Sequence, residues 1–161
     1  AALLLNRISL APGEAIFVSA GNLHTYLHGV GVEVMANSDN VLRGGLTPKH
    51  IDVRELVSVV DFEPRPPRVL SPVTEREGIE RYEISCPEFE VWRVLGTAAA
   101  IPLPGQGSAR ILFVVEGDLT VATAGESRTL HRGQAAFLAA AEQEVTSHGD
   151  GLAFLSASGT Q

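Results

Sequence analysis

Five side chains that could take part in chemistry lie close together in the first third of the chain: an imidazole, a phenol, a carboxylate and two cations. They are His24, Tyr26, Glu33, Arg43 and Lys49. Imidazole is a common metal ligand, a carboxylate buried beside a metal or a cation can carry a proton, and arginine and lysine bind anions. Ordinary roles are also open, because a single histidine is often a hydrogen-bonded core residue and Glu33 could point to solvent from its apolar strand.

A repeated pattern places the first of these residues. Leu10-Ala-Pro-Gly13-Glu-Ala-Ile-Phe17 and Leu130-His-Arg-Gly133-Gln-Ala-Ala-Phe137 share the pattern Leu-x-x-Gly-(Glu/Gln)-Ala-x-Phe at an offset of 120 residues. Each copy has a glycine that permits a tight turn, followed by an apolar strand. We interpret them as two copies of one β fold, the first copy lacking its beginning.

The first copy continues as Gly13-x5-Ser19-Ala-Gly21-x2-His24. This stretch resembles the second sequence motif of the cupins, with serine where proline is usual. In that small jelly-roll barrel the histidine of the motif points inward to a metal. The following stretch, from His24 to Asp52, reads HTYLHGVGVEVMANSDNVLRGGLTPKHID. It resembles the long signature of the type I phosphomannose isomerases, which runs approximately HAYL-x-G-x-x-x-E-x-M-A-x-S-D-N-x-x-R-x-G-x-T-P-K-x-x-D.

The resemblance implies that His24 is a zinc ligand and that Tyr26, Glu33, Arg43 and Lys49 are catalytic, with Tyr26, Arg43 and Lys49 contacting a sugar phosphate. Interconverting mannose 6-phosphate and fructose 6-phosphate moves a proton between C1 and C2 while charge develops on the carbonyl oxygen. A divalent metal and nearby cations stabilise that charge, and a phosphate needs Arg or Lys donors. The sequence does not decide which of the two cations meets the phosphate.

The metal site is incomplete in this sequence. A catalytic zinc needs about three protein ligands, whereas the resemblance supplies one here. The family's other ligands precede the signature, so we expect them in an amino-terminal part outside this chain, and we expect the chain alone to be inactive. In the second copy, Ala141-Glu-Gln-Glu144 aligns with Gly21-Asn-Leu-His24, which predicts a second barrel without metal. The other histidines are expected to be structural or exposed: His28, His50, His131 and His148.

The texture of the chain predicts an all-β fold with cupin-type jelly-roll barrels and one short helix. Glycine (16) and proline (9) separate short apolar stretches, and Asp52 and Glu55 have the spacing of a capping box before a helical repeat over 52–60. Residues 1–62 are expected to hold the last part of a catalytic cupin and the helix, 63–79 a proline-rich connector, and 80–161 a second, metal-free cupin. The expected strands cover 4–10, 15–18, 25–27, 31–35, 81–85, 89–95, 109–115, 119–124, 126–130, 135–138 and 151–157, with a tight hairpin turn at Gly117-Asp118.

The composition of the chain limits the kinds of partner that it is expected to bind. A net charge of −7 without a basic stripe argues against nucleic acid, and no uncharged stretch is apolar enough to span a bilayer. The lone Cys86 fits a reducing cytoplasm. We therefore expect a cytoplasmic protein that binds a small sugar phosphate, with self-association through an open barrel edge as a further expectation. Two other functions fit the sequence: a non-catalytic cupin-like module that binds a sugar, sugar phosphate or protein, and a different metal-dependent cupin.

Overall fold

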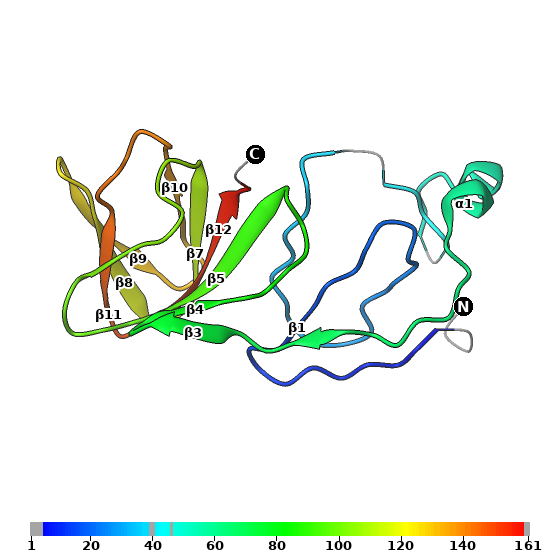
Figure 1. Ribbon diagram of the computed structural model, residues 1–161, viewed down its shortest axis with the longest axis horizontal. Coiled ribbons are helices and arrows are strands. Elements are labelled where there is room, and N and C mark those ends of the chain that lie inside the picture. Colours follow the sequence, from blue (N-terminus) through cyan, green and yellow to red (C-terminus); the bar gives the residue numbers. More distant parts are fainter. Residues whose placement is uncertain (1–4, 39–40, 46, 160–161) are drawn as a thin grey trace. The chain divides into compact units, whose positions relative to one another are not determined.

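The computed structural model describes residues 5–38, 41–45 and 47–159 and divides the chain into two compact units, 1–70 and 71–161. Over its described residues, the first unit contains one helix, α1 (Val53–Val59), and one antiparallel pair of short strands, β1 (Ala15–Ile16) and β2 (Val69–Leu70). The second contains all the other strands (Figure 1). An all-β fold with one short helix is thereby confirmed. No helix in the described part of the chain has the length and apolar character needed to cross a membrane.

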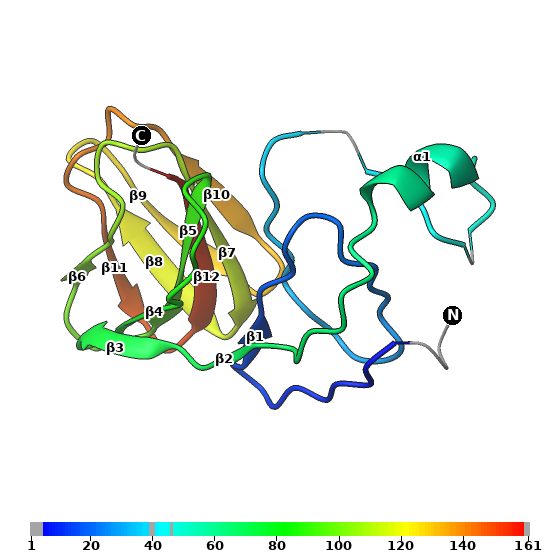
Figure 2. The ribbon, with the colours of Figure 1, turned by 45° about the vertical axis from the view of Figure 1, so that its right-hand side comes forward.

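The second unit consists of two antiparallel sheets that enclose a common core (Figure 2). The larger has the strand order β10-β7-β12-β5-β4-β3 and the smaller β6-β11-β8-β9. Their bounds are β3 (Val73–Arg76), β4 (Ile79–Arg81), β5 (Phe89–Leu95), β6 (Ile101–Pro102), β7 (Arg110–Glu116), β8 (Asp118–Ala122), β9 (Ser127–His131), β10 (Ala135–Leu138), β11 (Thr146–Gly149) and β12 (Leu152–Ser158).

The core of the second unit is formed by strands in which buried and more exposed side chains alternate. Along β12, Ala153 and Leu155 are buried while their neighbours are half-buried, which is the period of two that a strand imposes. Leu155 lies opposite Trp92 of β5 and Leu112 of β7, so the three fill one row across the larger sheet. The smaller sheet contributes further side chains to the same cluster: Leu119, Val121, Leu130 and Val145 from its strands and loops.

Several expected elements are present and others are not. Strands 89–95 and 135–138 match β5 and β10, and the helix begins after Asp52, whose side chain accepts a hydrogen bond from the Glu55 N–H at 2.9 Å. Expected strands 25–27 and 31–35 are wrong, since neither stretch has a ladder partner among the described residues. The expected strand 4–10 is unpaired over its described part, and Leu4 lies outside the described residues. β2, β3 and part of β4 lie within the proline-rich stretch 63–79.

The tight turn at Gly117 is present, but it is not a hairpin. Gly117 has a φ of 58° and separates β7 from β8, yet these strands belong to different sheets. A Cβ at Gly117 would lie 2.8 Å from the Cα of Gly151, so the chain needs glycine where two connections between the sheets pass each other. Spacing alone indicated the turn and could not reveal that it crosses from one sheet to the other.

Candidate functional site

Both copies of the repeat form the same turn. In the first, the Glu14 N–H donates to the Ala11 carbonyl oxygen at 3.0 Å, and the Glu14 carboxylate accepts from the Ala11 N–H at 2.7 Å. In the second, Gln134 and His131 make the same two bonds at 2.9 and 3.0 Å. The glycine of each turn has a positive φ, 88° in the first copy and 84° in the second. The Glu/Gln position of the pattern is therefore a capping side chain, which explains why either residue type can occupy it.

A second shared turn leads to the candidate metal ligand. The Asn22 N–H donates to the Ser19 carbonyl oxygen at 3.3 Å, and 120 residues later the Glu142 N–H donates to the Ala139 carbonyl oxygen at 3.0 Å. In the first copy, His24 Nδ1 lies 3.4 Å from the Asn22 carbonyl oxygen. A carbonyl can only accept, so this contact requires a hydrogen on Nδ1 and leaves Nε2 of the neutral ring with a free lone pair.

The structure brings three of the five predicted site residues together. His24 Nε2 lies 3.9 Å from the Glu33 carboxylate, and the rings of His24 and Tyr26 meet edge to face with centroids 5.9 Å apart. Partial burial, a hydrogen bond to Glu33 and the charge of that carboxylate raise the pKa of Tyr26 to about 12. The phenol therefore stays protonated at neutral pH and can donate to Glu33. The side chains of His24 and Glu33 are each about half exposed, at 48% and 47%, so the cluster is open to a solute.

Arg43 and Lys49 are placed less directly. Arg43 is half-buried and Lys49 exposed, and neither side chain makes a hydrogen bond or ion pair within the described part of the chain. The residue after Arg43, Gly44, packs against Leu23, because a Cβ added to it would lie 3.1 Å from the Leu23 side chain. The backbone of Gly44, next to Arg43, thus lies against the side chain of Leu23, next to His24. Asp39 and Asn40 of the signature lie outside the described residues.

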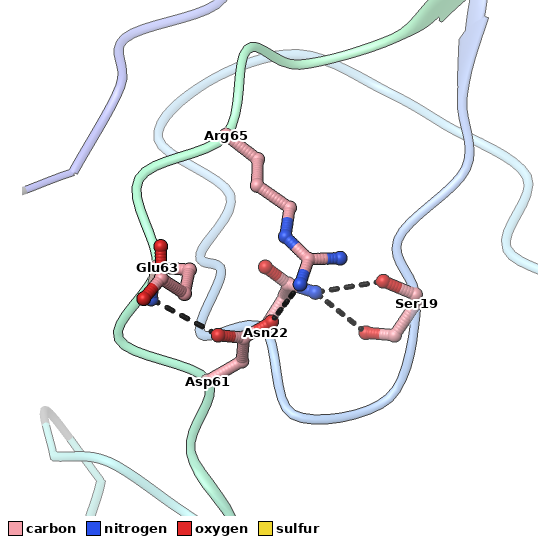
Figure 3. Close-up of polar contacts among 5 residues, drawn as sticks. All are labelled: Ser19, Asn22, Asp61, Glu63 and Arg65. Atoms are coloured by element: carbon pink, nitrogen blue, oxygen red, sulfur yellow. Dashed lines mark hydrogen bonds and ion pairs between the residues drawn. The ribbon is translucent and has the colours of Figure 1, made fainter.

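Sequence reasoning missed two sets of polar contacts, one within the turn before His24 and one in the segment after α1 (Figure 3). The Asn22 amide donates to Ser19 Oγ at 2.7 Å and to its carbonyl oxygen at 3.3 Å, and Arg65 pairs with Asp61 at 2.9 Å. The only sequence signal for the ion pair was the i, i+4 spacing of Asp61 and Arg65. That spacing is informative in helices, whereas Asp61 and Arg65 follow the end of α1.

The described residues contain no group of three or more His, Cys, Asp or Glu side chains that could hold a metal ion. His24 Nε2 nevertheless is a donor of the kind that zinc binds, and its lone pair is free when Nδ1 carries the hydrogen. His24 would hold the metal, and the Glu33 carboxylate, 3.9 Å from Nε2, would lie beside it. The described residues therefore fit one ligand position of a zinc site.

In the second copy, a buried arginine contacts the carbonyl that corresponds in sequence to the one facing His24. Arg110 is 1% exposed and donates to the carbonyl oxygens of Glu142 at 2.6 Å and Pro104 at 3.1 Å. Glu142 is 120 residues after Asn22, whose carbonyl contacts His24 in the first copy. Desolvation by burial lowers the pKa of Arg110. The Asn22 carbonyl of the first copy thus faces an imidazole, whereas the equivalent Glu142 carbonyl of the second copy accepts from a guanidinium.

The two sheets of the second unit, together with the repeated turns, define a β protein of the cupin class. In agreement with this, the sequence model of the family described as "Mannose-6-phosphate isomerase, cupin domain" matches residues 83–157. The chain is 45% identical over 150 residues to the mannose-6-phosphate isomerase of Escherichia coli (strain K12), covering 92% of this chain and 38% of that protein. It is 38% identical over 142 residues to the probable mannose-6-phosphate isomerase of Caenorhabditis elegans, covering 87% of this chain and 34% of that protein.

Solved structures give the same result. The crystal structure of mannose 6-phosphate isomerase from Salmonella typhimurium, bound to fructose 6-phosphate and zinc, aligns with a TM-score of 0.68 and 37% identity, over 78% of this chain and 32% of that one. The chain is therefore similar to mannose-6-phosphate isomerases, and it spans about a third of the length of the relatives named above.

Proposed function

We propose that the chain is part of an isomerase that interconverts mannose 6-phosphate and fructose 6-phosphate by zinc-assisted proton transfer between C1 and C2. The observation that carries this proposal is the cluster of His24, Tyr26 and Glu33, in which an imidazole nitrogen lies 3.9 Å from a carboxylate that a phenol also contacts. The similar Salmonella typhimurium enzyme, which binds zinc and fructose 6-phosphate, supports the choice of metal and substrate.

Each residue of the cluster has a chemical role in this proposal. His24 holds zinc through Nε2, since its Nδ1 faces the Asn22 carbonyl oxygen. When bound, zinc stabilises the negative charge that develops on the substrate oxygens during the proton transfer. Glu33 carries the proton between C1 and C2, and the Tyr26 hydroxyl orients the Glu33 carboxylate by donating to it.

The phosphate end of the substrate requires cations. Arg43 and Lys49 are proposed to supply them, because neither side chain has an internal partner among the described residues. The planar guanidinium of Arg43 suits two phosphate oxygens or the developing enediolate, whereas Lys49 acts as a single point charge. Both lie after the His24 turn in the signature stretch, and the backbone beside Arg43 packs near Leu23.

Zinc needs about three protein ligands, and the chain is proposed to supply His24 alone as a ligand. We infer that the others belong to the part of the relatives' length that this chain does not span, and that the chain by itself is inactive. In this arrangement residues 1–62 form part of a catalytic cupin, 63–79 a connector and 80–161 a second, metal-free cupin. A cytoplasmic location and self-association through an exposed sheet edge are further parts of the proposal.

The metal role is tested by His24→Ala in the full-length protein. Zinc content should fall, because the substitution removes a ligand, whereas His28→Ala at an exposed position four residues away should retain full zinc content. Metal analysis after dialysis against a weak chelator measures both. Unchanged zinc in His24→Ala would refute the assignment.

The substrate role is tested by Arg43→Ala. Loss of a cation that binds the phosphate or the developing charge should reduce kcat/KM by about 100-fold or more, with zinc content unchanged. Arg54→Ala, an exposed arginine of α1, is the matched control and should retain activity. Normal turnover in Arg43→Ala would contradict the role of Arg43. Sugar-phosphate binding without turnover in the zinc-loaded full-length protein would instead favour a non-catalytic binding module.

A further inference from the structure

The segment that leaves α1 lies against the turn that leads to His24. The Asp61 N–H donates to the Gly21 carbonyl oxygen at 2.9 Å. Gly21 has a φ of 81°, and a Cβ added to it would lie 2.9 Å from the Val59 carbonyl oxygen. The two backbones therefore approach each other too closely for any side chain at position 21. The position and conformation of residues 59–61 are thus coupled to those of the turn.

The Asp61 carboxylate contacts two later residues of its own segment, Glu63 and Arg65 (Figure 3). Oδ1 accepts a hydrogen bond from the Glu63 N–H at 3.0 Å, and Oδ2 pairs with the Arg65 guanidinium at 2.9 Å. Such an aspartate two residues before a backbone donor closes a local turn. Both oxygens are engaged, while the backbone N–H of the same residue bonds to the Gly21 carbonyl oxygen.

On the other side of this contact, the Asn22 side chain closes the turn. Its amide donates to both Ser19 Oγ and the Ser19 carbonyl oxygen, as Figure 3 shows. The Asn22 carbonyl oxygen then faces His24 Nδ1 at 3.4 Å, while His24 Nε2 faces Glu33 at 3.9 Å. A continuous series of contacts therefore leads from the Asp61 carboxylate to the orientation of the His24 ring.

We propose that Asp61 and Asn22 are positioning residues for His24: they hold the turn whose carbonyl keeps the hydrogen on Nδ1 and leaves Nε2 free to bind metal. The inference rests on the proposed function, in which His24 binds zinc. Partners of this kind outside the ligand set fix the tautomer and the orientation of a metal-binding histidine, and their loss typically weakens metal binding about 10- to 100-fold.

A purely structural role of Asp61 would have a different effect on His24 and on zinc binding. In the Asp61–Arg65 pair the Arg65 side chain is 64% exposed and the Asp61 side chain 28% exposed, and an ion pair with one well-exposed partner contributes little to stability. If the pair only stabilised a loop, its removal would leave the ring tautomer and the zinc affinity unchanged. Both readouts therefore separate positioning from stability.

The experiment compares Asp61→Ala and Asn22→Ala with Glu63→Gln in the full-length protein. The control changes an acid in the same segment whose side chain makes no hydrogen bond or ion pair within the described residues. Zinc affinity is measured by chelator competition. The fraction of His24 protonated on Nδ1 is measured by nitrogen NMR of the metal-free protein at a fixed alkaline pH. We expect each alanine variant to bind zinc about 10-fold more weakly and to show a smaller Nδ1–H fraction, with the control unchanged.

Two further variants keep the outcomes separate. Asp61→Asn retains an oxygen for the Glu63 N–H and should lose about threefold or less in zinc affinity, which protects the test against misfolding of the alanine variant. His24→Ala is the reference for loss of a ligand. If His24→Ala weakens zinc binding while Asp61→Ala changes neither affinity nor tautomer, the positioning role is wrong. If His24→Ala leaves zinc affinity unchanged, the proposed metal role of His24 fails instead, and the tautomer measurement still tests the contact series.

Discussion

Replacement of Arg110 by methionine tests the contacts of the buried arginine of the second unit. Arg110 is fully enclosed, and both of its Nη atoms donate to backbone carbonyls, those of Pro104 and Glu142. Gly105 covers its stem, since a Cβ there would lie 3.2 Å from the Arg110 Cδ. Methionine retains an unbranched apolar side chain but has no donor, so Arg110→Met leaves both carbonyls without their partner.

The expected loss follows from these two carbonyls. A hydrogen bond from a charged donor contributes about 1.5–3 kcal/mol, so the two together contribute about 3–6 kcal/mol. Pro104 is half-buried and Glu142 exposed, so water replaces part of what the carbonyls lose. The variant also removes the cost of burying an arginine whose Nε has no partner among the described residues, and this offsets part of the loss. We expect the free energy of unfolding of this unit to fall by about 2–4 kcal/mol.

Urea unfolding followed by tryptophan fluorescence measures this loss. Trp92 is the chain's single tryptophan and is 3% exposed in the core of the second unit, so its emission reports on that unit. Arg128→Met, at an exposed position of β9, is the matched control and should change stability by less than about 0.5 kcal/mol. A loss below about 1 kcal/mol for Arg110→Met, or a loss equal to that of the control, would refute the reasoning.

Two further substitutions test the packing and the helix cap. Gly96→Ala should destabilise the second unit by about 2 kcal/mol or more in the same urea assay, because its Cβ would lie 2.5 Å from the Gly149 carbonyl oxygen. Gly125→Ala, with no atom within 4 Å of its Cβ, should be nearly neutral, and equal losses for the two would contradict the explanation. Asp52→Ala should cost α1 about 0.5–2 kcal/mol through loss of the bond to the Glu55 N–H, seen as faster hydrogen exchange of the helix amides; unchanged exchange would show that the cap is dispensable.

The sequence predicted correctly those strands that are marked by their own residues and by flanking turn residues. β5 and β10 match expected strands residue for residue, since β-branched and aromatic residues favour strands between turn signals. β11 was missed, because its residues Thr146–Gly149 carry no apolar alternation and its place is set by pairing with β8 on one side and β6 on the other. The expected strands 25–27 and 31–35 failed for the related reason that a strand pattern forms a strand only where a partner satisfies its backbone.

In the candidate site, too, features that depend on local sequence were predicted and contacts between distant residues were not. The sequence by itself determined the residue types, the repeated turns and the resemblance carried by the stretch from His24 to Asp52, because these depend on order and spacing along the chain. Only the tertiary structure decided that Glu33 faces His24 Nε2, that Asp61 contacts the turn before His24, and that Arg110 holds the equivalent carbonyl in the second copy. These contacts join residues separated in sequence, and their formation depends on how the backbone folds between them, which no local propensity encodes.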